Sequence, residues 1–234
     1  MKRLAIAALG VAAVFVVAGS ALAAGGTRAS VIFDSTSPNG PATNQPSYGP
    51  EAYAFESIGD EITFAGTARS LSSVTVTLSS WACQQGTWNG QDCFTPSGAT
   101  FSHAITLTIW DANDPATPLV TSTQTFDVPY RPSASSKCTG TDAGKWYASA
   151  LKTCKNGITD DVTFNFSNET LPDTVVYAIS YNTNHYGPNP LLVAGPYDSL
   201  NVAIADGEPT VGVSTGDNFA NATPAVQFKA GNGS

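Results

Sequence analysis

The chain has 234 residues, of which 42% are hydrophobic and only 12% are charged, and its formal net charge is −8. Fifty residues are Ser or Thr, 21 are Gly and 15 are Pro, a composition that disfavours helices and, with its apolar content, also disfavours intrinsic disorder. The acidic balance argues against nucleic acid as a partner, because phosphate binding requires clustered Lys and Arg.

Residues 1–23 have the pattern of a secretory signal peptide. Lys2 and Arg3 form a positive start, residues 4–19 are an uncharged apolar stretch, and Ala21-Leu22-Ala23 supplies small residues for a signal peptidase. A retained membrane anchor is the alternative, but the stretch is short for a membrane span. We therefore expect cleavage directly after this segment and a secreted or cell-surface protein. Loss of the two basic residues changes the formal charge from −8 to −10. No later segment is apolar and long enough to span a membrane.

The rest of the chain divides into a polar segment, residues 24–51, and a single expected domain, residues 52–234. Val31-Ile32-Phe33 is the only apolar triplet of the polar segment and suits a first edge strand. Farther on, apolar residues alternate with Thr, Ser and Asn, which is typical of strands buried on one face. The alternating segments are 61–64, 73–79, 103–109, 123–128, 161–166, 174–181, 200–204, 211–213 and 226–228.

About nine or ten short strands and no convincing helix predict an all-β protein. The nearest helical candidate is residues 146–152, which would form one or two turns at most. Long connections are expected at residues 81–102, 129–160 and 182–197. These features favour a two-sheet antiparallel β-sandwich of the jelly-roll type.

Four cysteines remain after signal cleavage, and an even number in an exported chain indicates disulfides. Cys83, Cys93, Cys138 and Cys154 allow three connectivities. Pairing the first two and the last two is the most economical, because each pair brackets a polar segment between strand-like runs. Zinc is the alternative, but sequence spacings of 10 and 16 do not match the close cysteine pairs of zinc sites.

Several segments occur together in a distinctive order. They are 64–69, 73–81 leading to the first two cysteines, 98–101, 128–133 leading to Cys138, 181–187 and 197–202. In these segments the chain resembles a group of exported proteins common in high-GC Gram-positive bacteria. The resemblance covers about residues 52–205 and implies a secreted or cell-surface β-sandwich, but no particular activity. Members of this group often end in a surface anchor, which residues 228–234 do not resemble.

No convincing catalytic constellation is present, and we expect a non-catalytic protein. Residues 212–216 spell G-x-S-x-G, but a nucleophile elbow requires a following helix and a downstream His, whereas both histidines of the chain precede Ser214. A Gly/Ser/Thr turn is the simpler interpretation. Asp60-Glu61 and Asp160-Asp161 are adjacent pairs that would point to opposite faces of a strand instead of flanking one glycosidic bond.

Aromatic residues in loops are the candidates for ligand binding. Trp88 lies between the first two cysteines, Trp146 and Tyr147 lie between the last two, and His185 and Tyr186 lie in a loop rich in Asn, Gly and Pro. Aromatic faces can stack on sugar rings, and loops on a rigid scaffold often carry function. A glycan or another cell-envelope component is therefore the expected partner. The alternative is that these rings pack over the core and that the Asn-rich loop is a turn.

Calcium is the ion that the chain would suit best, because calcium binds carboxylate, amide and carbonyl oxygens. Asp111, Asn113 and Asp114 follow a strand-like run and are the candidate ligands. The segment lacks the Gly and the terminal Glu of an EF-hand loop, and Asx-Pro turn chemistry explains it without a metal. No other cofactor is expected.

The sequence thus predicts a non-catalytic, secreted or cell-surface β-sandwich that binds carbohydrate. One alternative is a structural envelope or matrix protein that self-associates. The other is a secreted hydrolase whose catalytic residues converge from distant parts of the chain.

Overall fold

The computed structural model describes residues 29–36, 45–189, 191–192, 194–216 and 223–231. Strands account for 51% and helices for 6%, which confirms the all-β prediction. The expected signal peptide, residues 1–23, lies outside the described residues. No helix among the described residues is long and apolar enough to cross a membrane.

Sheet A is organised around one central strand, β4. Its strands are β1 (Ser30–Asp34), β2 (Ser47–Tyr48), β4 (Ser70–Ser80), β9 (Ile158–Thr170), β11 (Leu200–Ala203) and β13 (Val226–Gly231). β9 pairs along one whole side of β4, while β13 and β11 share its other side. β1 continues the sheet beyond β13, and β2 continues it beyond β11.

Sheet B has five antiparallel strands, in the order β12-β3-β10-β5-β6. They are β3 (Ile58–Thr63), β5 (Thr100–Asp111), β6 (Asp114–Pro129), β10 (Thr174–Tyr181) and β12 (Val213–Ser214). β7 (Trp146–Ala148) and β8 (Thr153–Lys155) form a separate hairpin. The helical elements are α1 (Pro50–Tyr53) and two 3-10 turns, η1 (Gly140–Asp142) and η2 (Pro196–Ser199).

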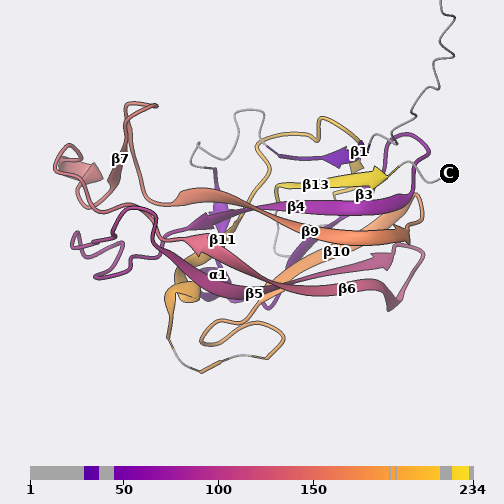
Figure 1. Cartoon of the computed structure of the whole chain (residues 1–234), viewed down its shortest axis with the longest axis horizontal. Coiled ribbons are helices and arrows are strands. Elements are labelled where there is room, and N and C mark those ends of the chain that lie inside the picture. The colour runs from indigo at the N-terminus through magenta and orange to yellow at the C-terminus, as the bar shows by residue number, and fades with distance from the viewer. Residues whose placement is uncertain (1–28, 37–44, 190, 193, 217–222, 232–234) are drawn as a thin grey trace, which may run out of the picture.

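The two sheets enclose one hydrophobic core (Figure 1). Alternation produces this core, because Val74, Val76 and Leu78 of β4 point inward and are fully buried. Rings from both sheets meet there: Phe228 of β13 packs on Tyr177 of β10, with ring centroids 5.4 Å apart. Thr and Ser occupy the outer positions, where they pair across strands as expected for a solvated sheet face. The β-sandwich prediction is therefore confirmed at the level of antiparallel sheets around a shared core.

The structure extends the sandwich toward the N-terminus. β1 covers the predicted edge strand at Val31-Ile32-Phe33 and pairs with β13. β2 pairs with β11, and α1 follows it directly. Parts of the polar segment, residues 24–51, therefore belong to sheet A, and the sandwich begins before residue 52.

The helical candidate at residues 146–152 is wrong. Its first residues form β7, which turns back and pairs with β8. Two ties hold this hairpin: the Cys138–Cys154 disulfide, and a 2.9 Å hydrogen bond from Trp146 Nε1 to the Gly157 carbonyl. The structure has thirteen strands among its described residues, and three of them, β2, β7 and β8, escaped prediction because segments of two or three residues are too short to show alternation.

The two disulfides have the local connectivity that was the most economical of the three. Cys83 is bonded to Cys93, and Cys138 is bonded to Cys154, so none of the four cysteines is free. Such bonds are typical of proteins that fold in an oxidising compartment.

Candidate functional site

A cavity of about 340 Å³ lies between the first disulfide loop, residues 83–93, and η2. We call it the Trp88 cavity. Its polar lining residues are Gln84, Thr87, Asn89 and Ser199, and its aromatic residues are Trp88 and Tyr130. None of the residues that line it is charged. A concave site with a few polar groups and aromatic walls is the usual form of a small-ligand site.

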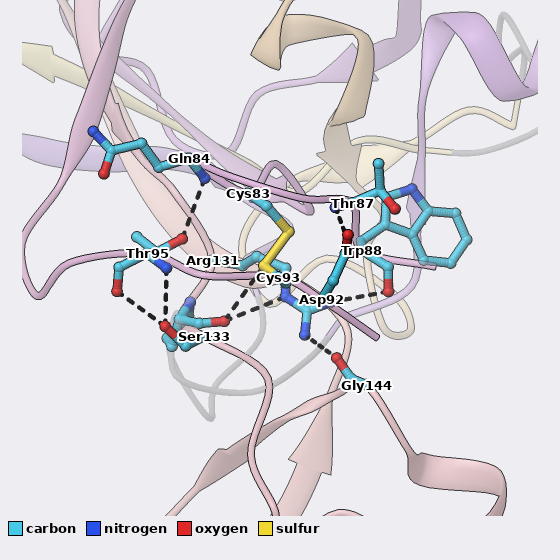
Figure 2. Close-up of a disulfide and its surroundings, with 11 residues drawn as sticks. Cys83, Gln84, Thr87, Trp88, Asp92, Cys93, Thr95, Arg131, Ser133 and Gly144 are labelled. Atoms are coloured by element: carbon cyan, nitrogen blue, oxygen red, sulfur yellow. Dashed lines mark hydrogen bonds between the residues drawn. A yellow bond between two sulfur atoms is a disulfide. The ribbon is translucent and has the colours of Figure 1, made fainter. Parts of the chain in front are cut away.

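The first disulfide loop is held in shape by its own contacts (Figure 2). The disulfide closes its base, and Gln85 and Phe94 exchange two backbone hydrogen bonds of 3.0 and 2.9 Å. Farther along, the Thr87 N–H donates to the Asp92 carboxylate at 2.9 Å. Gly86 adopts a φ of +73°, and a Cβ there would lie 2.4 Å from the Asp92 carbonyl oxygen, so only glycine fits this turn.

Trp88 is presented by this loop with part of its ring open to solvent. The residue is 40% exposed, and its ring packs edge-on against Trp81 with centroids 4.8 Å apart. Trp81 follows the last residue of β4, so the sheet itself supports Trp88. A ring that is fixed before a ligand arrives loses little conformational entropy on binding.

Arg131 lies beneath this loop and is fully buried. Its guanidinium donates to three carbonyl oxygens: Gly144 at 2.6 Å, Pro132 at 3.4 Å and Trp88 at 3.5 Å (Figure 2). No carboxylate among the described residues forms an ion pair with it. Burial lowers the pKa of Arg131 to about 10, so the group remains charged at neutral pH. Arg131 therefore connects the Trp88 loop to the chain that leads into β7.

We expect Arg131→Lys to destabilise the protein by about 1–3 kcal/mol. Lysine retains the buried charge but lacks the planar guanidinium, so it cannot donate to the carbonyls of Trp88 and Gly144 at the same time. Urea unfolding at pH 7 would measure the change. Lys152→Arg is the control, because Lys152 is exposed and an exchange of basic residues there should change the stability by less than about 0.5 kcal/mol. Equal losses in the two variants would contradict the bracing role of Arg131.

Trp146 and Tyr147 do not line the Trp88 cavity. The indole of Trp146 is tied to the Gly157 carbonyl and is partly buried. The ring of Tyr147 is also partly buried and lies 4.8 Å from the Lys137 ammonium. Trp146 thus ties the hairpin to the residue before β9, and Tyr147 contacts Lys137.

His185 and Tyr186 also lie outside this cavity. His185 joins its loop to α1, because Glu51 accepts from its backbone N–H at 2.8 Å and lies 2.9 Å from its Nδ1. Burial alone would raise the pKa of Glu51, but the hydrogen bonds from His185 outweigh it and lower that pKa. Tyr186 is partly buried and exchanges backbone and hydroxyl hydrogen bonds with Thr183. Of the five predicted ligand residues, the structure places only Trp88 at the cavity.

The calcium candidates lie in the hairpin between β5 and β6. The Asp111 carboxylate accepts from the Asn113 backbone N–H at 2.9 Å and from its side-chain amide at 3.2 Å. Asp114 begins β6 and pairs with Asp111 across the turn. This is Asx-type turn chemistry. The described residues contain no group of three acidic, His or Cys side chains that could hold a metal ion.

Ser214 of the G-x-S-x-G segment belongs to β12 and is not followed by a helix at residues 215–216. Its hydroxyl donates to Asp60 at 2.8 Å. Asp60 is fully buried, and this burial raises its pKa. Neither histidine bonds to Ser214, since His103 bonds to the Asn182 carbonyl and His185 bonds to Glu51. The segment therefore forms part of a short edge strand, and not the turn that was expected.

The adjacent acidic pairs, Asp60-Glu61 and Asp160-Asp161, lie inside β3 and β9. Asp60 of β3 points into the core, whereas Glu61 is only partly buried. In β9, Asp161 is exposed and accepts from the Thr77 hydroxyl at 2.7 Å. The two side chains of each extended pair thus point away from each other.

No protein-family model, curated protein or solved structure shows a significant match to the chain. The functional argument therefore depends on the chemistry of the Trp88 cavity itself.

Sequence reasoning missed most of this cavity. Gln84, Thr87 and Asn89 share the disulfide loop with Trp88, and their position in that loop was the available signal. Tyr130 and Ser199 come from distant parts of the chain, and no local pattern brings them to the same place.

Proposed function

We propose that the protein is a non-catalytic, secreted or cell-surface carbohydrate-binding module and that the Trp88 cavity is its glycan site. One observation carries this proposal: a tryptophan that is 40% exposed lies at a cavity whose polar lining residues are all uncharged. Sugars present both complementary features, since their ring faces carry C–H groups and their edges carry hydroxyls.

Different lining residues can contact different parts of a sugar. The indole of Trp88 offers a face for the sugar ring to stack on. The side-chain amide of Asn89 can donate to and accept from sugar hydroxyls, and the hydroxyl of Thr87 can do the same. Because no lining residue is charged, a neutral sugar meets no buried unpaired charge in this cavity.

Export is the second part of the proposal. It is supported by the signal-peptide pattern of residues 1–23 and by two disulfides, which persist in oxidising compartments. We further propose a jelly-roll-like arrangement of the sandwich. Its support is that neighbouring strands of sheet A are distant in sequence, as in β1-β13-β4-β11-β2.

We expect Trp88→Ala to weaken glycan binding by about 10-fold or more, because a central aromatic ring of a binding site commonly contributes more than about 1 kcal/mol. A glycan array and polysaccharide pull-down on residues 24–234 would identify the ligand. Isothermal titration would then compare the variants.

Phe94→Ala is the matched control. Phe94 is 52% exposed and belongs to the same part of the chain, but it does not line the cavity. The Phe94→Ala variant should bind glycan with the same affinity as the unaltered protein. If no glycan binds, or if both substitutions weaken binding equally, the assignment of this site is wrong.

A further inference from the structure

We propose that the free edge of β6 pairs with the same edge of a second copy of this chain. The proposal is independent of the glycan site. β6 is the last strand of sheet B, and β5 pairs with it on one side. No other described strand pairs with it, and Figure 1 shows it at the margin of the sheet. An edge strand leaves alternate backbone N–H and C=O groups without a strand partner.

This edge is partly exposed: β6 approaches β9 at Phe126, whose ring packs on Phe164 with centroids 5.0 Å apart, while the threonines of β6 remain open to solvent. The inward-facing residues Ser122, Gln124 and Phe126 are only partly buried, although a central strand would bury such positions completely. On the opposite face of β6, Thr121, Thr123 and Thr125 are all exposed.

The usual protection against edge pairing covers only the first part of β6. Pro115 and Pro118 lie there, and the pairing with β5 shifts register around Leu119. Proline and irregular backbone both discourage the addition of another strand. From residue 120 onward the pairing with β5 is regular, and residues 120–126 contain no proline, glycine or charged residue.

Charge favours a second copy as the occupant of this edge. The chain carries a formal charge of −8, so two copies repel unless they meet at a neutral surface. β9, the edge of sheet A, contains Asp160, Asp161 and Glu169, whereas residues 120–126 of β6 are uncharged. In an antiparallel pairing centred between residues 121 and 125, Asp127 would lie opposite an uncharged residue of 115–123.

Such a pairing is self-complementary, because each copy contributes the same segment around a two-fold axis. The two five-stranded sheets would then form one continuous sheet, with threonines of the two copies side by side. The contact is small, so we expect a dimer whose fraction rises with protein concentration.

Sedimentation velocity over a concentration series tests this pairing, with Thr123→Lys as the variant and Thr163→Lys as the control. The two threonines are matched: both are exposed on edge strands, and each shares a hydroxyl hydrogen bond with a Thr on the next strand, at 2.8 and 2.9 Å. Thr123→Lys should suppress dimerisation, because the lysines of the two copies would lie near each other across the two-fold axis and repel. Thr163→Lys should dimerise like the unaltered protein.

Hydrogen exchange gives a second readout on the backbone itself. Amides of residues 120–126 should exchange more slowly at high than at low protein concentration, and this difference should vanish in Thr123→Lys. A protein that remains monomeric at all concentrations would overturn the proposal. So would a dimer that Thr123→Lys leaves intact.

Discussion

Replacing Cys83 and Cys93 by Ala should abolish glycan binding and lower the free energy of unfolding by about 3 kcal/mol. The disulfide closes a loop between residues separated by 10 positions, and this closure lowers the conformational entropy of the unfolded chain. The same loop positions Trp88, Gln84 and Asn89, which supply much of the cavity wall. Without the bond, noncovalent contacts such as the Gln85–Phe94 pairing, the Thr87–Asp92 hydrogen bond and the packing of Trp88 on Trp81 would hold the loop less firmly, so its ordering would oppose binding.

The Cys138→Ala, Cys154→Ala double variant is the matched control. Its disulfide spans 16 positions, so the expected loss of stability is similar, at about 3 kcal/mol. Neither cysteine lines the Trp88 cavity, and glycan affinity should therefore remain. Urea unfolding and glycan titration at pH 7 would separate the two effects. If both double variants bind glycan normally, the first disulfide loop is not the binding element.

Raising the pH above 10 should destabilise the protein by about 1.4 kcal/mol per pH unit. Tyr177 and Tyr181 are fully buried, and burial raises the pKa of each well above 10.0. Above that pH the unfolded chain releases two protons that the folded chain retains, so the stability falls as the pH rises. Arg131 acts in the opposite direction, because its folded pKa of about 10 lies below 12.5. The two tyrosines lower the stability and the one arginine raises it as the pH increases. The net effect is that unfolding releases one proton, so the free energy of unfolding falls with pH.

Tyr177→Phe tests this balance. The Tyr177 hydroxyl makes only a long contact of 3.4 Å with the Pro224 carbonyl, whereas the Tyr181 hydroxyl donates to the Leu200 carbonyl at 2.6 Å. Removing the first hydroxyl should therefore preserve the fold and leave one tyrosine opposed by one arginine. Urea unfolding between pH 9 and about pH 11.5 should then show almost no slope. An unchanged slope would contradict the assignment to these buried tyrosines.

The sheet interior was the part of the fold that sequence reasoning could predict. Val74, Val76 and Leu78 alternate with polar residues, and this period places them on one face of a strand whatever the strand pairs with. The start of β6 was missed because Pro, Ala and Thr at residues 115–118 do not alternate in hydrophobicity. Its strand pairing depends on β5 next to it, and local sequence does not record that neighbour.

The candidate site was predictable only where it is local. Trp88 could be found because it lies between two cysteines that close a short loop. Arg131 could not, since a basic residue between Tyr130 and Pro132 ordinarily suggests an exposed loop. Its buried guanidinium is satisfied by hydrogen bonds to three carbonyl groups, those of Trp88, Pro132 and Gly144. The first of these comes from a distant part of the chain.

The pairing of β1 with β13 also places the ends of the described chain at the end of the sandwich opposite the first disulfide loop. Ser30 lies beside Ala230, and Ala230 lies beside Leu71 near the start of β4, so both ends of the described chain leave from one end of the sandwich. The Cys83–Cys93 loop follows the other end of β4, roughly 30 Å away for a strand of this length. Figure 1 shows this polarity, with the end of β13 and the β7 hairpin on opposite sides. A chain tethered to a surface by either terminus would therefore hold its disulfide loops outward, toward the surrounding medium.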